Sequence, residues 1–363
     1  YYGIGTRFTT FLEGISRRAG VETKVEYRPG CLTDRPNVNE AQWAAFEAED
    51  ADVTIAILGN HPFLDGEEGD AIASPTKGDR EKVELPPHQV AYLEELRRRG
   101  NRIVLVLTGG GAFTLEGVDK LADAILLTWY PGQAGGDALA SVLFGDVEPS
   151  GKLPVSFPRR TEDLPLFEDY DMSQRTYRFS DKAMYPFGFG LGYGSATIEN
   201  VELGSGNVEN GEIVGGRSRA ERSRCVLPAE LFEDRGGEAR RGTTRLFGGS
   251  PEEALDLEVT VKNDGDGPKR DVLQVYVSHP NRKGTPRYQL CGVLPLLMPA
   301  DARTTSVVPV PLRWLTIVDE YGVRYLPEAE LELVVGTSSP GGERLGAPEP
   351  VRIRIELVRE DES

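Results

Sequence analysis

The sequence predicts an α/β sandwich with a mostly parallel sheet, followed by an all-β sandwich. Continuous apolar runs alternate with segments of helical period in the first half, whereas the last hundred residues place apolar side chains at every second position. A stretch rich in Gly, Arg, Glu and Ser separates these patterns. We therefore expect an α/β region at 1–195, a linker or irregular insertion at 196–253, and a β-sandwich at 254–363.

The helices of the first region are predicted from the spacing of apolar residues. Between Thr9 and Ala19 the side chains of Phe11, Leu12 and Ile15 fall on one face, and Thr9 or Thr10 is the candidate N-cap. The other expected helices are 39–49, 87–99 and 135–144. Each is bounded by capping residues or glycines that suit a helix end.

Strands of two kinds are expected beside these helices. The segments 53–58, 103–107 and 124–129 are continuously apolar, which is typical of strands buried on both faces of a parallel sheet. Residues 21–27 alternate between apolar and polar, which predicts a further strand.

The last region has the period of a half-buried sheet. Leu255, Leu257, Val259 and Val261 alternate with polar residues before a turn at 263–267. Further short strands are expected at 272–278, 304–311, 329–336 and 351–358. This succession predicts a β-sandwich of about a hundred residues.

Composition excludes several classes of function. A net charge of −17 would repel a nucleic-acid backbone, and no apolar run reaches the roughly 18 residues that a membrane span needs. The three cysteines and the three histidines, His61, His88 and His279, lack the spacing of metal or redox sites. We expect no nucleic acid, membrane, metal or cofactor as a partner.

The first residues, Tyr1 to Gly5, contain neither an initiator Met nor a signal-peptide pattern, so we expect a segment upstream of them. Three widely spaced cysteines indicate reduced thiols rather than a disulfide framework. A cytoplasmic location is slightly favoured, and a signal peptide ahead of Tyr1 stays open.

Several strings along the first 195 residues occur in a specific order. They are Gly66 to Asp70 (GEEGD), Gly78 to Arg80 (GDR), Leu85 to Gln89 (LPPHQ), Val104 to Gly110 (VLVLTGG), Trp129 to Gly136 (WYPGQAGG), Pro149 to Pro158 (PSGKLPVSFP), Arg175 to Phe179 (RTYRF) and Tyr185 to Tyr193 (YPFGFGLGY). Together they resemble the second, α/β sandwich domain of glycoside hydrolase family 3, the family of β-xylosidases and β-glucosidases.

The tail carries a weaker resemblance. The strings at 259–263, 275–277 and 333–339 are similar to the fibronectin type III-like domain that often follows, so the expected fold there is an immunoglobulin or fibronectin III-like sandwich. By the same resemblance, the family's (β/α)8 barrel and the first strand of its second domain are absent before Tyr1.

The resemblance implies a retaining mechanism, in which one carboxylate attacks the anomeric carbon and a carboxylic acid about 5 to 5.5 Å away protonates the leaving oxygen. In relatives the nucleophilic Asp lies in the barrel, and the acid/base Glu often lies on a loop of the second domain. Aligning Gly66 and Glu67 with that loop makes Glu67 the candidate acid/base and Glu68 the alternate.

The acidic neighbours fit this role. Asp65, Glu68 and Asp70 are like charges beside Glu67, and like charges together with burial raise a carboxyl pKa. Without the flanking strings, a solvated acidic loop would be the better interpretation. We interpret Asp79 and Arg80 as an ion pair that shapes the base of the loop rather than as sugar ligands.

Other features favour structural roles. The glycines at 109–111 follow a strand, yet neither phosphate-binding pattern is present, so we do not expect a nucleotide. Gly132, Gly135 and Gly136 fit a tight turn into a helix. Trp129 and Tyr130 fit either a sugar subsite or core packing.

Two functions remain open. In the first, the chain supplies Glu67 to a glycosidase whose barrel, in cis or in trans, supplies the nucleophile. The substrates would be aryl or oligosaccharide β-glycosides, with xylosides, as in xylan breakdown, slightly favoured over glucosides because the loop after Glu68 is long. In the second, the chain is a non-catalytic carbohydrate-binding or structural module. In either case we expect no turnover by the isolated chain.

Overall fold

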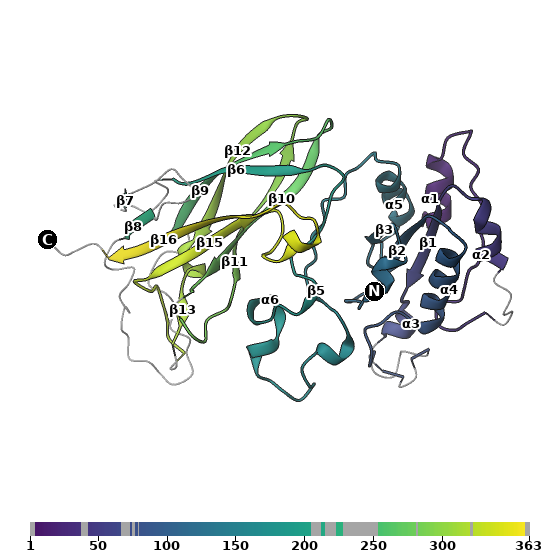
Figure 1. Cartoon of the computed structure of the whole chain (residues 1–363), viewed down its shortest axis with the longest axis horizontal. Helices are drawn as coiled ribbons and strands as arrows, with labels where there is room; N and C mark the ends of the chain where they lie inside the picture. The colour runs from purple at the N-terminus through teal and green to yellow at the C-terminus, as the bar shows by residue number, and fades with distance from the viewer. Residues whose placement is uncertain are drawn as a thin grey trace. The chain divides into compact units, whose positions relative to one another are not determined.

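The computed structural model describes residues 4–37, 43–66, 73–74, 77–78, 80–204, 212–214, 223–227, 253–280, 282–319 and 322–359. The chain forms two compact units (Figure 1). Unit 1 comprises 1–147 and 157–166, and unit 2 comprises 148–156 and 167–363. The chain therefore passes from one unit to the other three times, rather than once near residue 195.

Unit 1 is built on a parallel sheet of three strands in the order β1-β2-β3. These strands are β1 (Thr54–Gly59), β2 (Ile103–Thr108) and β3 (Ala124–Leu127). They arise from the three apolar runs expected to form central strands, and β3 ends two residues earlier than expected. In the central strand β2, Leu105 and Val106 are both fully buried although they point to opposite faces, as the continuous apolar run predicts.

Helices lie on both sides of this sheet (Figure 1). They are α1 (Phe11–Arg18), α2 (Trp43–Glu47), α3 (Pro62–Asp65), α4 (Pro87–Arg98) and α5 (Gly135–Leu143). Ile15 of α1 and Leu139 of α5 pack with Val106 in one core cluster. The predicted N-cap is confirmed at Thr10, whose side chain accepts a hydrogen bond from the Glu13 amide at 3.1 Å.

The strand expected at 21–27 is not formed. Thr54 and Asn60 donate their amides to β2, at Arg102 and Thr108, so the alternate residues of β1 turn their backbone groups away from β2. No described residue pairs with the outward groups of Ile55 and Ile57. An alternating pattern needs a hydrogen-bonded neighbour to become a strand, and no described residue pairs with 21–27 in this way.

Unit 2 contains two larger sheets with mostly antiparallel pairing. One sheet has the order β12-β9-β6, and the other has the order β11-β10-β15-β16-β8-β7, in which only β16 and β8 are parallel. Their strands are β6 (Ala196–Leu203), β7 (Glu212–Val214), β8 (Ser223–Leu227), β9 (Ala254–Asn263), β10 (Lys269–Ser278), β11 (Gln289–Met298), β12 (Arg303–Pro311), β15 (Glu330–Gly336) and β16 (Val351–Arg359).

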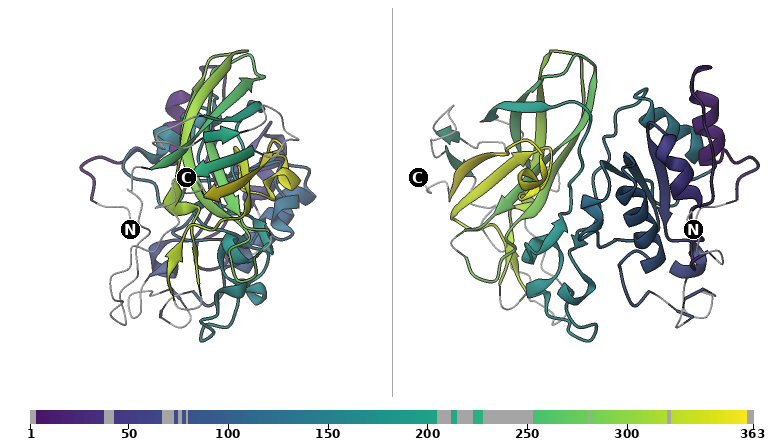
Figure 2. Two further views of the ribbon diagram at one scale, coloured as in Figure 1. Left: turned by 90° about the vertical axis from the view of Figure 1, so that its left-hand side faces the viewer. Right: turned by 45° about the vertical axis from the view of Figure 1, so that its right-hand side comes forward.

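The two sheets share one hydrophobic core, so they lie face to face (Figure 2). All four alternating residues of β9, from Leu255 to Val261, are buried in it, as predicted. The range expected to be a linker, 196–253, differs from that expectation: it begins with β6, which pairs with β9, and it contains β7 and β8. The described part of this range is therefore not linker but belongs to the sheets.

Shorter elements complete the chain. The remaining helix is α6 (Thr176–Phe179), and the short strands are β4 (Phe157–Pro158), β5 (Ala183–Tyr185), β13 (Ile317–Val318) and β14 (Arg324–Tyr325). Single turns of 3-10 helix occupy Ala48–Asp50, Val118–Lys120, Thr161–Asp163, Met172–Gln174, Leu312–Trp314 and Gly342–Leu345.

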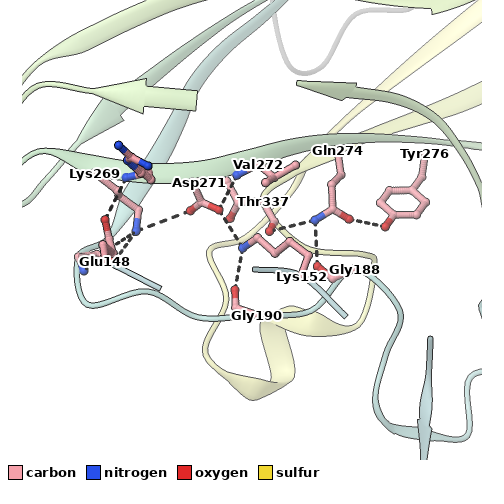
Figure 3. A network of polar contacts seen from close by, with 12 residues as sticks. Glu148, Lys152, Gly188, Gly190, Lys269, Asp271, Val272, Gln274, Tyr276 and Thr337 are labelled. Carbon is pink, nitrogen blue, oxygen red and sulfur yellow. Dashed lines mark hydrogen bonds and ion pairs between the residues drawn. The ribbon is translucent and has the colours of Figure 1, made fainter. Parts of the chain in front are cut away.

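A buried polar network in unit 2 fixes two loop segments to β10 (Figure 3). The Lys269 ammonium donates to Glu148 Oε1 at 2.9 Å and to the Gly194 carbonyl at 2.8 Å, and it lies 3.6 Å from Asp271 Oδ2. Lys152 Nζ lies 2.8 Å from the other oxygen of Asp271 and donates to the Gly190 carbonyl at 2.7 Å. Two ammonium groups and two carboxylates therefore neutralise one another in the interior.

The same network continues along β10 as neutral hydrogen bonds. Gln274 Nε2 donates to the carbonyls of Gly188 at 2.9 Å and Thr337 at 3.3 Å, and the Tyr276 hydroxyl donates to Gln274 Oε1 at 2.5 Å. Burial raises the pKa of Tyr276 above its usual range, which keeps this hydroxyl a donor.

Candidate active site

The carboxyl ends of the three parallel strands gather the candidate site in unit 1. In open α/β sheets this edge is where ligands are bound, because the loops that leave neighbouring strands meet there. The segment after β1 runs from Asn60 through α3 to Gly66, the segment after β2 contains the glycines 109–111, and the segment after β3 begins with Thr128, Trp129 and Tyr130.

Asp65, at the end of α3, is the centre of this edge. Its Oδ2 accepts hydrogen bonds from the Tyr130 hydroxyl at 2.8 Å and from the Gly110 amide at 3.2 Å. Its Oδ1 accepts from Asn60 Nδ2 at 3.3 Å and forms an ion pair with Arg80 Nε. One carboxylate therefore joins segments that follow all three strands.

Arg80 supplies the counter-charge from the far end of the expected acidic loop. The side chains of Asp65 and Arg80 are only 9% and 16% exposed, so this ion pair is largely shielded from solvent. Arg80 Nη2 also donates to the Ala112 carbonyl at 3.1 Å, and its guanidinium lies over the Phe113 ring. The stretch that begins at Gly66 is thus held at both ends, because Asp65 just before it is paired with Arg80 at its end.

The last residue of β1 is held in a separate way. Gly59 has φ of +126°, and both its amide and its carbonyl bond to the Gln89 side chain at 2.8 Å. Gln89 Nε2 also donates to the Thr33 carbonyl at 2.9 Å. The buried amide of Gln89 therefore takes the place that a neighbouring strand would have beside Gly59.

The predicted acid/base Glu67 and its alternate Glu68 lie outside the described residues, as does Asp79. The expected ion pair between Asp79 and Arg80 therefore stays a prediction, and the structure shows in addition that Arg80 pairs with Asp65. Asp65 was also expected to act as a like charge beside Glu67. Its charge is instead compensated by Arg80, so this part of the expectation needs correction.

Sequence reasoning missed the bond between Tyr130 and Asp65. The two residues are 65 positions apart, so only the sheet order brings them together. Trp129, the other aromatic candidate, has φ of +55° and packs edge-on against Phe157 with ring centroids 6.4 Å apart. Of the two earlier interpretations of Trp129, this contact supports core packing.

The other candidate groups have structural surroundings. His61 caps α3 by accepting the Phe63 amide at Nδ1, and His88 Nε2 lies 2.8 Å from the Leu32 carbonyl. Burial lowers the pKa of His279 to about 4. Cys31, Cys225 and Cys291 are free. In the described ranges, no cluster of three such side chains could hold a metal ion, and no helix there is long and apolar enough to cross a membrane.

Curated relatives support one family. A Xylan 1,4-beta-xylosidase from Xylanibacter ruminicola is 43% identical over 152 residues, which are 42% of this chain and 17% of the relative. A Periplasmic beta-glucosidase from Salmonella typhimurium is 32% identical over 236 residues, which are 56% of this chain and 30% of that protein. This chain thus spans less than a third of either relative.

Solved structures show the same fold. The crystal structure of a GH3 beta-glucosidase from Bifidobacterium adolescentis superposes with a TM-score of 0.70, at 24% identity, over 97% of this chain and 46% of that one. The family model described as the Glycosyl hydrolase family 3 C-terminal domain matches residues 2–193. The mixed α/β chain with its three-stranded parallel sheet therefore belongs to the glycosyl hydrolase family 3 C-terminal domain family.

Proposed function

We propose that this chain supplies the general acid/base, Glu67, of a retaining β-glycosidase, while a (β/α)8 barrel in cis or in trans supplies the nucleophilic Asp. The observation that carries the proposal is the position of Gly66. It follows directly on Asp65, which is fixed at the carboxyl edge of the sheet, so the chain leaves this edge at the residue before Glu67.

The proposed substrates are oligosaccharide or aryl glycosides with a terminal β-D-xylosyl or β-D-glucosyl residue. The names of the two relatives, a xylosidase and a glucosidase, support this range. The higher identity to the xylosidase agrees with the slight preference for xylosides and with a role in xylan breakdown. The two face-to-face sheets of unit 2 support a fibronectin type III-like assignment for that part.

A general acid has a distinctive kinetic signature, which gives the test. The chain is combined with a family 3 barrel, and hydrolysis of nitrophenyl and dinitrophenyl xylosides and glucosides is followed. Glu67→Gln should lower kcat/KM by about 10² to 10⁴ for the nitrophenyl glycosides. It should lower kcat/KM far less for the dinitrophenyl glycosides, because their leaving group needs little protonation. Their kcat should still fall, because in a retaining mechanism the same Glu is the base that activates water in the second step.

Matched variants identify the residue. Glu68→Gln tests the alternate, and Glu94→Gln on the exposed face of α4 is the control for loss of one carboxylate. Full activity of Glu67→Gln together with loss of activity in Glu68→Gln would transfer the role to Glu68. Full activity of both variants would contradict an acid/base on this loop.

The second candidate function is a non-catalytic carbohydrate-binding or structural module. The interactions that support it are those of Asp65, Tyr130 and Arg80, which join segments of unit 1 and would hold a fold without any chemistry. Equal rates for a barrel with and without this chain would favour that function.

A further inference from the structure

At least four groups converge on the Asp65 carboxylate, and this convergence goes beyond what a helix end requires. Tyr130 comes from the segment after β3, Gly110 from the segment after β2, and Asn60 from the end of β1. Arg80 comes from the far end of the stretch that begins at Gly66. The same carboxylate therefore fixes where the stretch 66–80 starts and where it ends.

We infer that Asp65, Arg80 and Tyr130 are positioning residues, which hold the segment carrying the acid/base in register with the carboxyl edge of the sheet. This inference rests on the proposed function for its kinetic consequences. The contacts of Asp65 with Arg80 and Tyr130, called the clamp below, involve described residues only. They can therefore be tested without any measurement of activity.

Described residues inside the stretch follow the same arrangement. The Ala73 amide donates to the Phe63 carbonyl of α3 at 3.0 Å, and the Lys77 amide donates to the Ser74 carbonyl at 3.1 Å. Ser74 is buried. The chain therefore returns to α3 between Gly66 and Arg80, as expected if α3 and the Asp65 ion pair form a common base.

The charges argue that the clamp acts through position. The groups that face Asp65 include the Arg80 guanidinium, the Tyr130 hydroxyl, the Asn60 amide and the Gly110 amide, and His61 lies at the other end of α3. Three neutral donors and one cation compensate a single negative charge. A compensated carboxylate has little charge left with which to repel a second carboxylate.

The clamp is tested first in the full chain without a barrel. Tyr130→Phe removes a single hydroxyl and keeps the ring. Arg80→Met removes the positive charge, and Arg80→Lys keeps a positive charge but lacks the planar guanidinium. Amide exchange is measured in peptides covering 59–66 and 108–113. We expect exchange there to accelerate at least tenfold in Arg80→Met, less in Tyr130→Phe, and to be partly restored in Arg80→Lys.

Two controls separate the clamp from general destabilisation. Arg97→Met breaks an ion pair with Asp123 that adjoins the opposite, amino-terminal edge of the sheet, where Asp123 accepts the Ile103 amide. Tyr170→Phe removes a hydroxyl from a residue that is 87% exposed. Exchange at 59–66 that is unchanged in both Arg80→Met and Tyr130→Phe, or equally raised in Arg97→Met, would overturn the inference.

The kinetic test uses the chain combined with a family 3 barrel. Misplacing a catalytic group by about 1 Å costs on the order of 100-fold. We therefore expect Asp65→Asn and Arg80→Met to lower kcat/KM about 100-fold for nitrophenyl glycosides and far less for dinitrophenyl glycosides, whose leaving group needs little protonation. Arg80→Lys should recover part of the loss.

The pH profile distinguishes position from charge. If Asp65 acted by repelling the acid, Asp65→Asn would lower the pKa of that acid and shift the basic limb of the kcat profile to lower pH. We expect the limb to stay in place while the plateau falls, and a shifted limb would overturn the positioning role. A barrel complex whose rate survives Glu67→Gln and Glu68→Gln contradicts the proposed function instead, and the exchange experiment still decides the clamp.

Discussion

Replacing Lys269 with Met should destabilise unit 2 by about 3 kcal/mol. The Lys269 side chain is only 4% exposed, and its ammonium contacts Glu148, Asp271 and the Gly194 carbonyl. Met has a similar length and keeps the packing, but it leaves two buried carboxylates with a single ammonium, that of Lys152. Removing one partner of a buried ion pair costs about 3 to 5 kcal/mol.

The lower end of that range follows from the remaining contacts. Glu148 keeps two backbone donors, the amides of Gly194 and Arg270, both at 3.0 Å, and Asp271 keeps Lys152 at 2.8 Å. Desolvation opposes the charged form of Glu148, but these amides and Lys269 outweigh it and lower its pKa below the usual value. Its contribution is therefore present above the pKa of an unfolded Glu, and it is lost as pH falls through the lower pKa of the folded chain.

Native-state hydrogen exchange in β10 provides the assay, because a chain of two compact units need not unfold in one step. A loss of about 3 kcal/mol corresponds to exchange that is roughly 150-fold faster. The peptide covering β2 in unit 1 serves as the internal reference and should keep its rate.

An exposed ion pair in the same unit is the matched control. Arg303 bonds to both oxygens of Glu199, at 2.7 and 3.0 Å, but these side chains are 64% and 31% exposed. Arg303→Met should therefore cost less than about 1 kcal/mol. If Lys269→Met lowered the free energy of unfolding no more than Arg303→Met, the claim that a buried ion pair stabilises unit 2 more than an exposed one would be refuted.

Three further predictions concern other sites. Gly59→Ala should cost more than about 2 kcal/mol in thermal or urea unfolding of unit 1, because Gly59 has φ of +126° and a Cβ there would lie 2.1 Å from the Thr108 carbonyl oxygen. Burial, aided by Arg282, lowers the pKa of His279 to about 4, so the neutral ring stabilises unit 2 above pH 6.5. Up to about 3 kcal/mol should be lost as pH falls from 6.5 to 4, and His279→Gln should flatten the pH dependence of urea unfolding in that window. Burial raises the pKa of Cys225 to about 11 and also raises the pKa of Cys31, but Cys31 is half-buried whereas Cys225 is buried. A thiol reagent at pH 8 should therefore label Cys31 first, as mass analysis of peptides would show.

The elements with a strong period could be predicted from the sequence. The helix at Pro87–Arg98 and the strands β2 and β9 lie where the apolar spacing places them. The strand expected at 21–27 is not formed, because an alternating pattern shows which side chains are apolar but not whether a neighbouring strand is available for pairing. The free outer edge of β1 shows that this neighbour is absent from the described residues.

Two strands that were not predicted, β6 and β11, contain residues that are uncommon in strands. β6 carries Glu199, Asn200 and Glu202, although Ile198 and Val201, which flank a bulge, are buried. β11 contains Gly292 and Pro295, two residues that weaken a strand prediction. Tertiary packing against β9 and β10 overrides these local preferences.

The sequence predicted where in the fold the candidate site lies, but not which of its residues are in contact. The order of strands and loops places the segment after β1 at the carboxyl edge, and that much follows from the sequence. The contact of Arg80 with Asp65, 15 residues earlier, did not follow, because the sequence offered the adjacent Asp79, which lies outside the described residues. Contacts between residues far apart in the sequence depend on the register of the sheet.

Most of the strings that identify the family lie apart from the residue proposed for the chemistry, since only the string from Gly66 to Asp70 contains Glu67. A Cβ on Gly190 would lie 2.2 Å from the Gly151 carbonyl oxygen, and one on Gly188 would lie 2.2 Å from Gln274 Oε1. These glycines let the strings at 149–158 and 185–193 approach each other and β10, where Lys152 is also held. Their specificity thus reflects backbone packing in unit 2, whereas proton transfer would depend on a loop of unit 1. A match to these strings therefore establishes the fold, and the role of Glu67 has to be tested at the loop itself.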